Sequence, residues 1–156
     1  MTTISTIAQH TADKLAIAEA LYRYAAGIDL RDKALFASAL TEDAVSDFRP
    51  AAAKAGFEYP VIEGIDVLVA AISTSLSSLD TTHTISNQRV TIDGNTAHLE
   101  ALVEAQHVPR SDSTRHYLMK NRYDVDLVRS GNDWLIRRIV VDNVWRSGDP
   151  TVLSVV

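Results

Sequence analysis

Apolar positions in the first part of the chain recur at helical spacing. After Thr11, a half-formed N-cap, hydrophobic residues follow every three or four positions as far as Asp29. We predict a first helix that ends near Asp29, where Gly27 loosens it, preceded by a flexible N-terminus at residues 1–10. The residues that carry this pattern are Leu15, Ile17, Ala18, Leu21, Tyr22, Ala25 and Ile28.

Two more helices are expected before the pattern changes. Residues 32–40 predict a short second helix, and residues 44–48 predict a short strand. Residues 50–60, bounded by prolines, are expected to form a loop. A third helix follows from Gly64, with one face formed by Val67, Leu68, Ala71, Ile72, Ser75, Leu76 and Leu79.

After His83 the hydrophobic positions alternate, as in long antiparallel strands. Asp93-Gly94 predicts a hairpin turn between strands at 88–92 and 97–107. Two further strands are predicted at 114–128 and 134–145. Because several of these strands exceed the usual five or six residues, we expect the sheet to curl. Helices followed by a curled antiparallel sheet indicate one α+β domain over residues 1–156, with 149–156 as a C-terminal tail.

Composition excludes several classes of site. The chain has no cysteine, which rules out disulfides, thiolate metal sites and a cysteine nucleophile, and fits a reducing compartment. The net charge of −5 argues against nucleic-acid binding. No signal peptide is evident at residues 1–9, and no apolar run approaches the ~20 residues that span a bilayer. We therefore expect a cytoplasmic protein without nucleic-acid or membrane partners.

Three segments in this order resemble the SnoaL-like branch of the NTF2-like superfamily. They are the helix end Tyr22-Arg23-Tyr24-Ala25-Ala26-Gly27-Ile28-Asp29, the segment Thr82-His83-Thr84-Ile85-Ser86-Asn87, and the pair of tryptophan motifs between Gly131 and Arg146. The resemblance covers residues ~11 to ~149. It implies a cone-shaped barrel in which three N-terminal helices pack on a strongly curved, mostly antiparallel sheet with a pocket between them.

Within the superfamily, the closest resemblance is to the group of scytalone dehydratase, hexachlorocyclohexane dehydrochlorinase and bile-acid dehydratase. It implies that Asp29 and His83 form a catalytic pair, and that Tyr24, His107 and Arg146 match residues that contact substrate in one or another of these enzymes. No single relative supplies all of these residues. The alternation of the third strand adds Asn121 to the expected pocket wall, with Tyr117, Met119 and Tyr123 on the same face.

A carboxylate that orients an imidazole enables it to remove a proton next to an activating group and then to protonate a leaving hydroxide. We therefore predict a cofactor-independent, dehydratase-like lyase acting on a hydrophobic cyclic or polyketide-like small molecule. Two alternatives stay open. One is an isomerase or polyketide cyclase that uses the same pair. The other is a non-catalytic binding domain, with Asp29 in solvent and His83 bonded to backbone.

No metal and no cofactor are expected. His98 and His116 fall within predicted strands, without spacing to a second histidine and without a carboxylate pair beside them. A homo-oligomer, dimer or trimer, is expected. The reason is that Ile136 and Val140 oppose Ile139 and Val141 on a regular strand, which would leave one apolar face uncovered.

Overall fold

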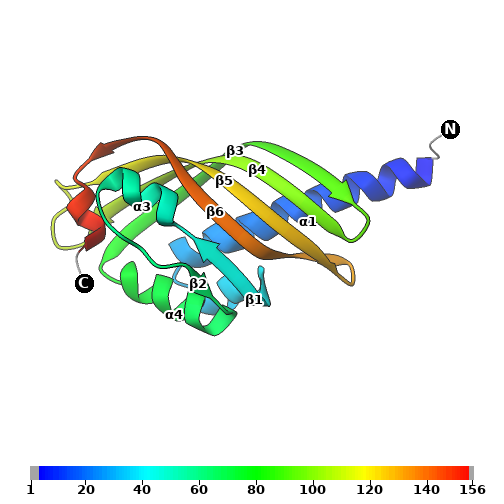
Figure 1. Ribbon diagram of the computed structural model, residues 1–156, viewed down its shortest axis with the longest axis horizontal. Coiled ribbons are helices and arrows are strands. Elements are labelled where there is room, and N and C mark those ends of the chain that lie inside the picture. The colour runs from blue at the N-terminus through cyan, green and yellow to red at the C-terminus, as the bar shows by residue number, and fades with distance from the viewer. Residues whose placement is uncertain (1–3, 155–156) are drawn as a thin grey trace.

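The computed structural model describes residues 4–154, which form helices packed on one curved sheet (Figure 1). The elements in chain order are α1 (Ile4–Asp29), α2 (Lys33–Ala37), β1 (Leu40–Asp47), α3 (Arg49–Ala55), β2 (Ile62–Glu63), α4 (Ile65–Ser75), β3 (Leu79–Asp93), β4 (Thr96–Pro109), β5 (Tyr117–Ser130), β6 (Asp133–Gly148) and the 3₁₀ helix η1 (Pro150–Ser154).

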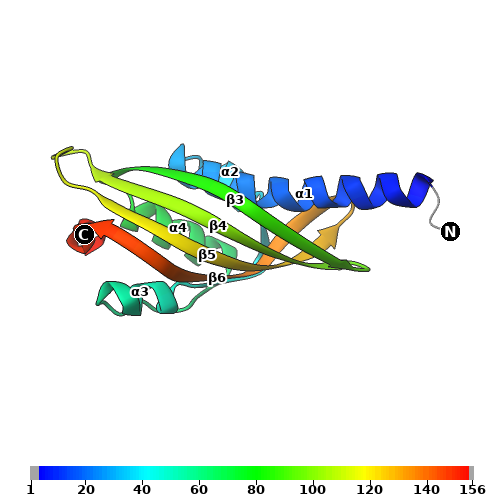
Figure 2. The same cartoon turned by 90° about the horizontal axis from the view of Figure 1, so that it is seen from above.

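The six strands form a single sheet in the order β2-β1-β6-β5-β4-β3. The pairing of β1 with β6 is parallel and the other pairings are antiparallel. Figure 2 shows the long strands β3 to β6 sweeping diagonally across the molecule, with α1 running along them. The predicted α+β fold with a curved, mostly antiparallel sheet is confirmed. Its helices number four within residues 4–154, because α3 joins the three that were predicted.

Bulges set which side chains of β6 face the helices. The pairing of β5 with β6 shifts between Asp126 and Leu127 and again between Lys120 and Asn121. The first shift brings Ile136 and Ile139 onto one face, and both are fully buried. The expectation that Ile136 and Val140 oppose Ile139 and Val141 is therefore wrong. The oligomer that was inferred from it stays a prediction.

Several predicted boundaries are wrong for local reasons. Helix α1 begins at Ile4, so residues 4–10 of the expected flexible N-terminus are helical; residues 1–3 lie outside the described part. Thr11 lies inside this helix, where its hydroxyl donates to the Ile7 carbonyl at 2.9 Å instead of capping. The expected loop at 50–60 begins with helix α3, because Pro50 stands in the first helical turn and three alanines follow.

Two other predicted boundaries are wrong because the structure has more secondary structure there than was expected. Strand β3 begins at Leu79, before His83, since the threonines at positions 81, 82 and 84 favour strand over helix. His116 precedes β5 and lies in the loop. The expected C-terminal tail contains η1, whose Val152 is fully buried, while residues 155–156 lie outside the described part. Within residues 4–154, no helix has the length and hydrophobicity needed to cross a membrane.

An ion pair anchors α1 along the sheet. Both carboxylate oxygens of Asp13 accept hydrogen bonds from Arg129, at 2.7 and 2.8 Å, and Oδ1 also accepts from the Trp134 indole at 3.3 Å. The Arg129 guanidinium stacks 4.5 Å from the Trp134 ring centroid. The bonds from Arg129 hold the pKa of Asp13 well below its usual range despite burial. The N-terminal turns of α1 then project beyond the sheet (Figures 1 and 2).

The other end of α1 is fixed by close packing. Helix α2 crosses α1 at Gly27, where a Cβ would lie 2.6 Å from the Cβ of Phe36 and closer still to its backbone nitrogen. Phe36 also packs edge-on against Tyr24, with ring centroids 4.9 Å apart. This contact determines where the chain turns after Asp29.

We predict that Gly27→Ala destabilises the protein, although alanine favours an isolated helix by about 1 kcal/mol. The added methyl group must displace the Phe36 backbone, so the net loss in unfolding free energy should be about 2 kcal/mol or more. Chemical denaturation measures this, with Lys14→Ala on the exposed face of the same helix as the control. A more stable Gly27→Ala protein would contradict the packing described for α2.

Candidate functional site

A cavity of about 360 Å³ opens between α1, α4 and the inner face of the sheet. Aromatic and aliphatic side chains form most of its wall, and a few polar groups interrupt it. The polar residues are Ser46, Glu58, Ser75, His83, His107 and Asn121, together with the tyrosines Tyr24, Tyr59 and Tyr123. The apolar wall includes Ile28, Phe48, Phe57, Ile72, Leu76, Met119, Val141 and Leu153.

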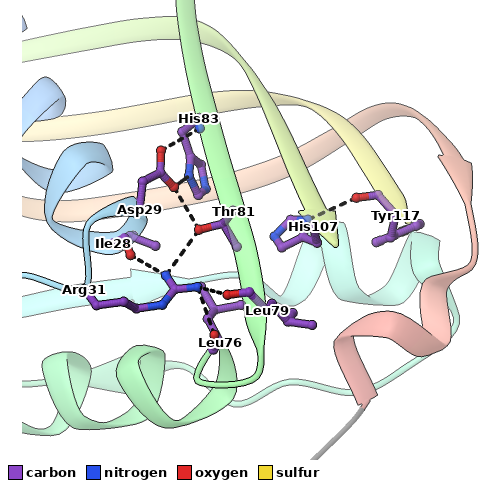
Figure 3. Close-up of polar contacts among 9 residues, drawn as sticks. All are labelled: Ile28, Asp29, Arg31, Leu76, Leu79, Thr81, His83, His107 and Tyr117. Atoms are coloured by element: carbon purple, nitrogen blue, oxygen red, sulfur yellow. Dashed lines mark hydrogen bonds and ion pairs between the residues drawn. The ribbon is translucent and has the colours of Figure 1, made fainter. Parts of the chain in front are cut away.

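The carboxylate of Asp29 stands at the end of α1, against the edge strand β3. Its Oδ1 lies 2.7 Å from Nδ1 of His83, and its Oδ2 accepts the backbone N–H of His83 at 2.7 Å (Figure 3). The hydroxyl of Thr81 donates to Oδ1 at 2.9 Å. Because β3 is at the edge of the sheet, the outer N–H of His83 has no neighbouring strand and is free to hold this carboxylate.

These donors keep Asp29 ionised. Burial alone would raise the pKa of its carboxyl, but the ring and backbone of His83 and the hydroxyl of Thr81 outweigh burial and lower the pKa below its usual value. An ionised carboxylate only accepts hydrogen bonds, so neutral His83 carries its proton on Nδ1. Nε2 then keeps a lone pair and is the ring nitrogen available to a ligand.

Arg31 stabilises the arrangement of Asp29, Thr81 and His83 by hydrogen bonds to Thr81 and to nearby backbone carbonyls. It has a left-handed backbone, with φ of 58°, which ends α1 without a glycine. Its guanidinium donates to Thr81 Oγ1 at 3.2 Å, to the Leu76 carbonyl at 2.9 Å, and to the carbonyls of Ile28 and Leu79. Since Thr81 Oγ1 accepts from Arg31, its own proton is directed at Asp29 (Figure 3).

His107 lies beside His83, on the neighbouring strand β4, with ring centroids 6.2 Å apart, and both line the cavity. Its Nδ1 lies 3.2 Å from the backbone carbonyl of Tyr117, which can only accept, so Nδ1 carries the proton and Nε2 keeps a lone pair (Figure 3). Burial, followed by the nearby His83, lowers the pKa of His107 to about 4. His107 is therefore neutral at physiological pH.

The other residues that were predicted to bind substrate differ in how deeply they are buried. Tyr24 is buried in the wall, and desolvation raises the pKa of its hydroxyl, which stays protonated. Asn121 is 1% exposed and accepts a hydrogen bond on Oδ1 from Asn143 Nδ2 at 3.0 Å. Arg146 is exposed and does not line the cavity; its Nη1 donates to Asn143 Oδ1 at 3.3 Å.

The expectation that no carboxylate pair accompanies His98 is wrong. Cross-strand pairing places His98 opposite Asp126, 2.9 Å from its Oδ1, and 3.5 Å from Asp124. The three side chains could hold a metal ion, but they lie on the outer face of the sheet, partly exposed, and Arg138 competes for Asp126 at 3.7 Å. They are not part of the cavity.

Comparison with known proteins assigns this chain to a family. The profile of the SnoaL-like domain matches residues 9–140. The chain belongs to the SnoaL-like domain family. It is also 31% identical over 149 residues to terrestric acid biosynthesis cluster protein E of Penicillium crustosum, covering 91% of this chain and 90% of that protein.

Solved structures share the fold of this SnoaL-like protein. The Kfla4162 protein of Kribbella flavida superposes with a TM-score of 0.83 at 23% identity, covering 93% of this chain and 99% of that one. A protein of Novosphingobium aromaticivorans provisionally named scytalone dehydratase gives 0.78 at 15% identity, covering 92% and 91%. A hexachlorocyclohexane dehydrochlorinase of Novosphingobium barchaimii gives 0.75 at 14% identity, covering 90% and 92%. The resemblance to the SnoaL-like branch with an NTF2-like fold is confirmed.

Sequence reasoning missed Thr81, Arg31 and the aromatic side of the cavity in this SnoaL-like protein. Thr81 stands two positions before His83, so on a strand both point to the same side, but β3 was expected to begin later. Arg31 was not considered because its partners lie about 50 positions away, at Leu76, Leu79 and Thr81. Phe57 and Tyr59 stand in what was expected to be an ordinary loop and pack near Phe48.

The depressed pKa of His107 predicts a pH-dependent stability. Between pH about 6.5, the ordinary histidine pKa, and about 4, the unfolded chain binds a proton that folded His107 does not, so stability falls as the pH falls. His107→Gln should reduce this slope by up to about 1.4 kcal/mol per pH unit, measured by urea denaturation across that range.

His98→Gln is the matched control. The hydrogen bond from His98 to Asp126 raises the pKa of His98, so this residue contributes stability at low pH that is lost as the pH rises through that pKa. Its removal should not flatten the acid slope. An unchanged slope in His107→Gln would show that His107 is protonated in the folded protein.

Proposed function

We propose that this protein is a cofactor-independent acid/base lyase that carries out a dehydratase-like elimination on a hydrophobic cyclic or polyketide-like small molecule. The observation that supports this most directly is the 2.7 Å contact between Asp29 Oδ1 and His83 Nδ1 at the wall of a largely apolar cavity. The pair resembles an orienting carboxylate with its general base, and nothing in the proposed chemistry requires a metal.

In the proposed reaction, Nε2 of His83 removes a proton from a carbon next to the activating carbonyl of the substrate. The electron pair of that C–H bond forms the carbon–carbon double bond, and the bond from the neighbouring carbon to its hydroxyl breaks. The imidazolium then gives its proton to the departing hydroxide, and water leaves. Asp29 stabilises the imidazolium that exists between the two transfers, and the three donors around it hold its geometry.

His83, and not His107, is assigned the role of base. The two rings face one cavity, but the pKa of about 4 makes His107 a weak proton acceptor. No carboxylate contacts the His107 ring within residues 4–154; its Nδ1 meets a backbone carbonyl. We assign His107 and the Tyr24 hydroxyl to hydrogen bonding with polar groups of the substrate.

The wall of the cavity supports the substrate class. Phe48 packs against Phe57 and Tyr59, with ring centroids 6.4 and 5.6 Å apart, and these rings give the cavity an aromatic, apolar side that suits a hydrophobic ligand. The relative from Penicillium crustosum is named for a biosynthesis cluster, which supports a role in small-molecule metabolism.

Proton abstraction is testable before the natural substrate is identified. Incubated in D₂O with a panel of cyclic ketones and β-hydroxyketones, the wild-type protein should accelerate deuterium incorporation next to the carbonyl, followed by NMR, and release enone from the hydroxyketones. His83→Ala should lower both rates about 10²- to 10⁴-fold, because the only general base assigned here is lost. Asp29→Asn should come close to this loss, since neutral asparagine neither fixes the tautomer nor balances the imidazolium.

His98→Ala, on the outer face of the sheet, is the control and should keep wild-type rates. Deuterium incorporation without water loss across the whole panel would favour the isomerase or cyclase alternative with the same base. Ligand binding without incorporation, equal in wild type and His83→Ala, would leave a binding domain and refute the lyase.

A further inference from the structure

A chain of hydrogen bonds on β5 and β6 leads from the protein surface to the part of the cavity wall that β5 forms. Arg146 Nη1 donates to Asn143 Oδ1 at 3.3 Å, and Asn143 Nδ2 donates to Asn121 Oδ1 at 3.0 Å. Asn121 lines the cavity, while Asn143 is 2% exposed. The bulge between Lys120 and Asn121 in the β5–β6 pairing brings these three side chains to the same face of the sheet.

The orientation of the Asn143 amide follows from its surroundings. Its Nδ2 lies 3.3 Å from the Lys120 carbonyl and 3.0 Å from the Trp145 carbonyl, and both of these groups can only accept. Its Oδ1 faces Arg146, which can only donate. A rotated amide would set oxygen against two carbonyls and NH₂ against a guanidinium. Only one of the two amide orientations satisfies the neighbours.

The orientation of the Asn143 amide determines the orientation of the Asn121 amide. Because Asn143 presents NH₂ to Asn121, the Asn121 atom that faces it must be the oxygen. The NH₂ group of Asn121 is then the end available to the cavity, and within residues 4–154 it has no hydrogen-bond acceptor of its own. A buried donor without a partner is costly unless a ligand or water supplies an acceptor.

We propose that Asn143 and Arg146 are positioning residues that hold the Asn121 amide with its NH₂ group toward the cavity, so that this wall binds a carbonyl oxygen of the ligand. Arg146 thereby acts through two asparagines and does not contact the ligand. The charge of Arg146 also polarises the chain of bonds and strengthens the donor at its far end. On the neighbouring strands β3 and β4, Nε2 of His83 and of His107 present lone pairs, so the lining of the cavity offers a hydrogen-bond donor at one place and acceptors at another.

The proposal specifies the substrate class further. A cyclic ketone fits this arrangement of donor and acceptors, with its oxygen at Asn121 and its acidic C–H bond at His83. When the proton leaves, negative charge develops on that oxygen, and the Asn121 donor stabilises the charge. This last step rests on the proposed lyase function, whereas the donor itself can be tested by binding alone.

The test compares two probes of similar shape that carry no leaving hydroxyl: 1-tetralone, which has a carbonyl acceptor, and tetralin, which has none. Their affinities for wild type and variants are measured by NMR titration. Asn121→Leu should weaken tetralone about two- to tenfold relative to tetralin, the effect of one net hydrogen bond. Asn143→Leu should give a similar relative loss, because it frees the Asn121 amide to rotate. Arg146→Met should give a smaller loss of the same sign.

The ratio of the two affinities separates positioning from a structural role, since a distorted cavity would weaken both probes alike. Arg137→Met is the matched control: Arg137 is an exposed arginine of β6 whose side chain makes no ion pair or hydrogen bond with residues 4–154, and its removal should leave the ratio unchanged. Equal loss of both probes in Asn143→Leu, or an unchanged ratio in Asn121→Leu, would overturn the proposal, as would a wild-type protein that binds neither probe.

Should Asn143→Leu fail to fold, Arg146→Met decides the matter, because Arg146 is exposed and its loss leaves the core intact. An unchanged ratio in that variant would then refute the relay. If the wild-type protein shows no deuterium exchange but keeps its relative affinity for tetralone, the lyase function is contradicted and the role of Asn121 as a hydrogen-bond donor is supported.

Discussion

Much of this structure is arranged around the Asp29 carboxylate, which is partly buried at the end of a helix. Leaving such a charge without partners would cost several kcal/mol, and the C-terminal end of a helix is itself unfavourable for an anion. Three donors from β3 compensate: the ring and backbone of His83 and the hydroxyl of Thr81. That solution requires β3 to be the edge strand and α1 to end where it does.

The ending of α1 depends in turn on Gly27 and Arg31. Gly27 allows α2 to cross at close range, and Arg31 turns the chain in a left-handed conformation. The Arg31 side chain compensates for the strain of that conformation by binding three backbone carbonyls and Thr81. Arg31 thus links the end of α1 to the start of β3, and the catalytic geometry that we propose is a consequence of how these two elements join.

Whether a feature could be predicted from the sequence depended on how far apart in the chain the interacting residues lie. The Asp93-Gly94 hairpin, the helix end at Asp29 and the curled antiparallel sheet follow from local patterns and were predicted correctly. The bulges of β6 were not predictable. Their extra residues, which have no partner on β5, are Arg137 and Val144, and neither residue carries a local signal for a bulge. The pairing of His98 with Asp124 and Asp126 depends on register, and the Arg31 contacts join positions about 50 apart, so neither could be read from spacing.

The central claim is that His83 presents Nε2 as a base because Asp29 holds its other nitrogen. Two-bond ¹H–¹⁵N NMR of protein labelled with ¹⁵N-histidine, recorded well above the ordinary histidine pKa of about 6.5, reports this directly. We expect neutral His83 to be protonated on Nδ1, with a strongly downfield proton that disappears in Asp29→Asn. Protonation on Nε2, or rapid averaging between the two tautomers in the wild-type protein, would contradict the account.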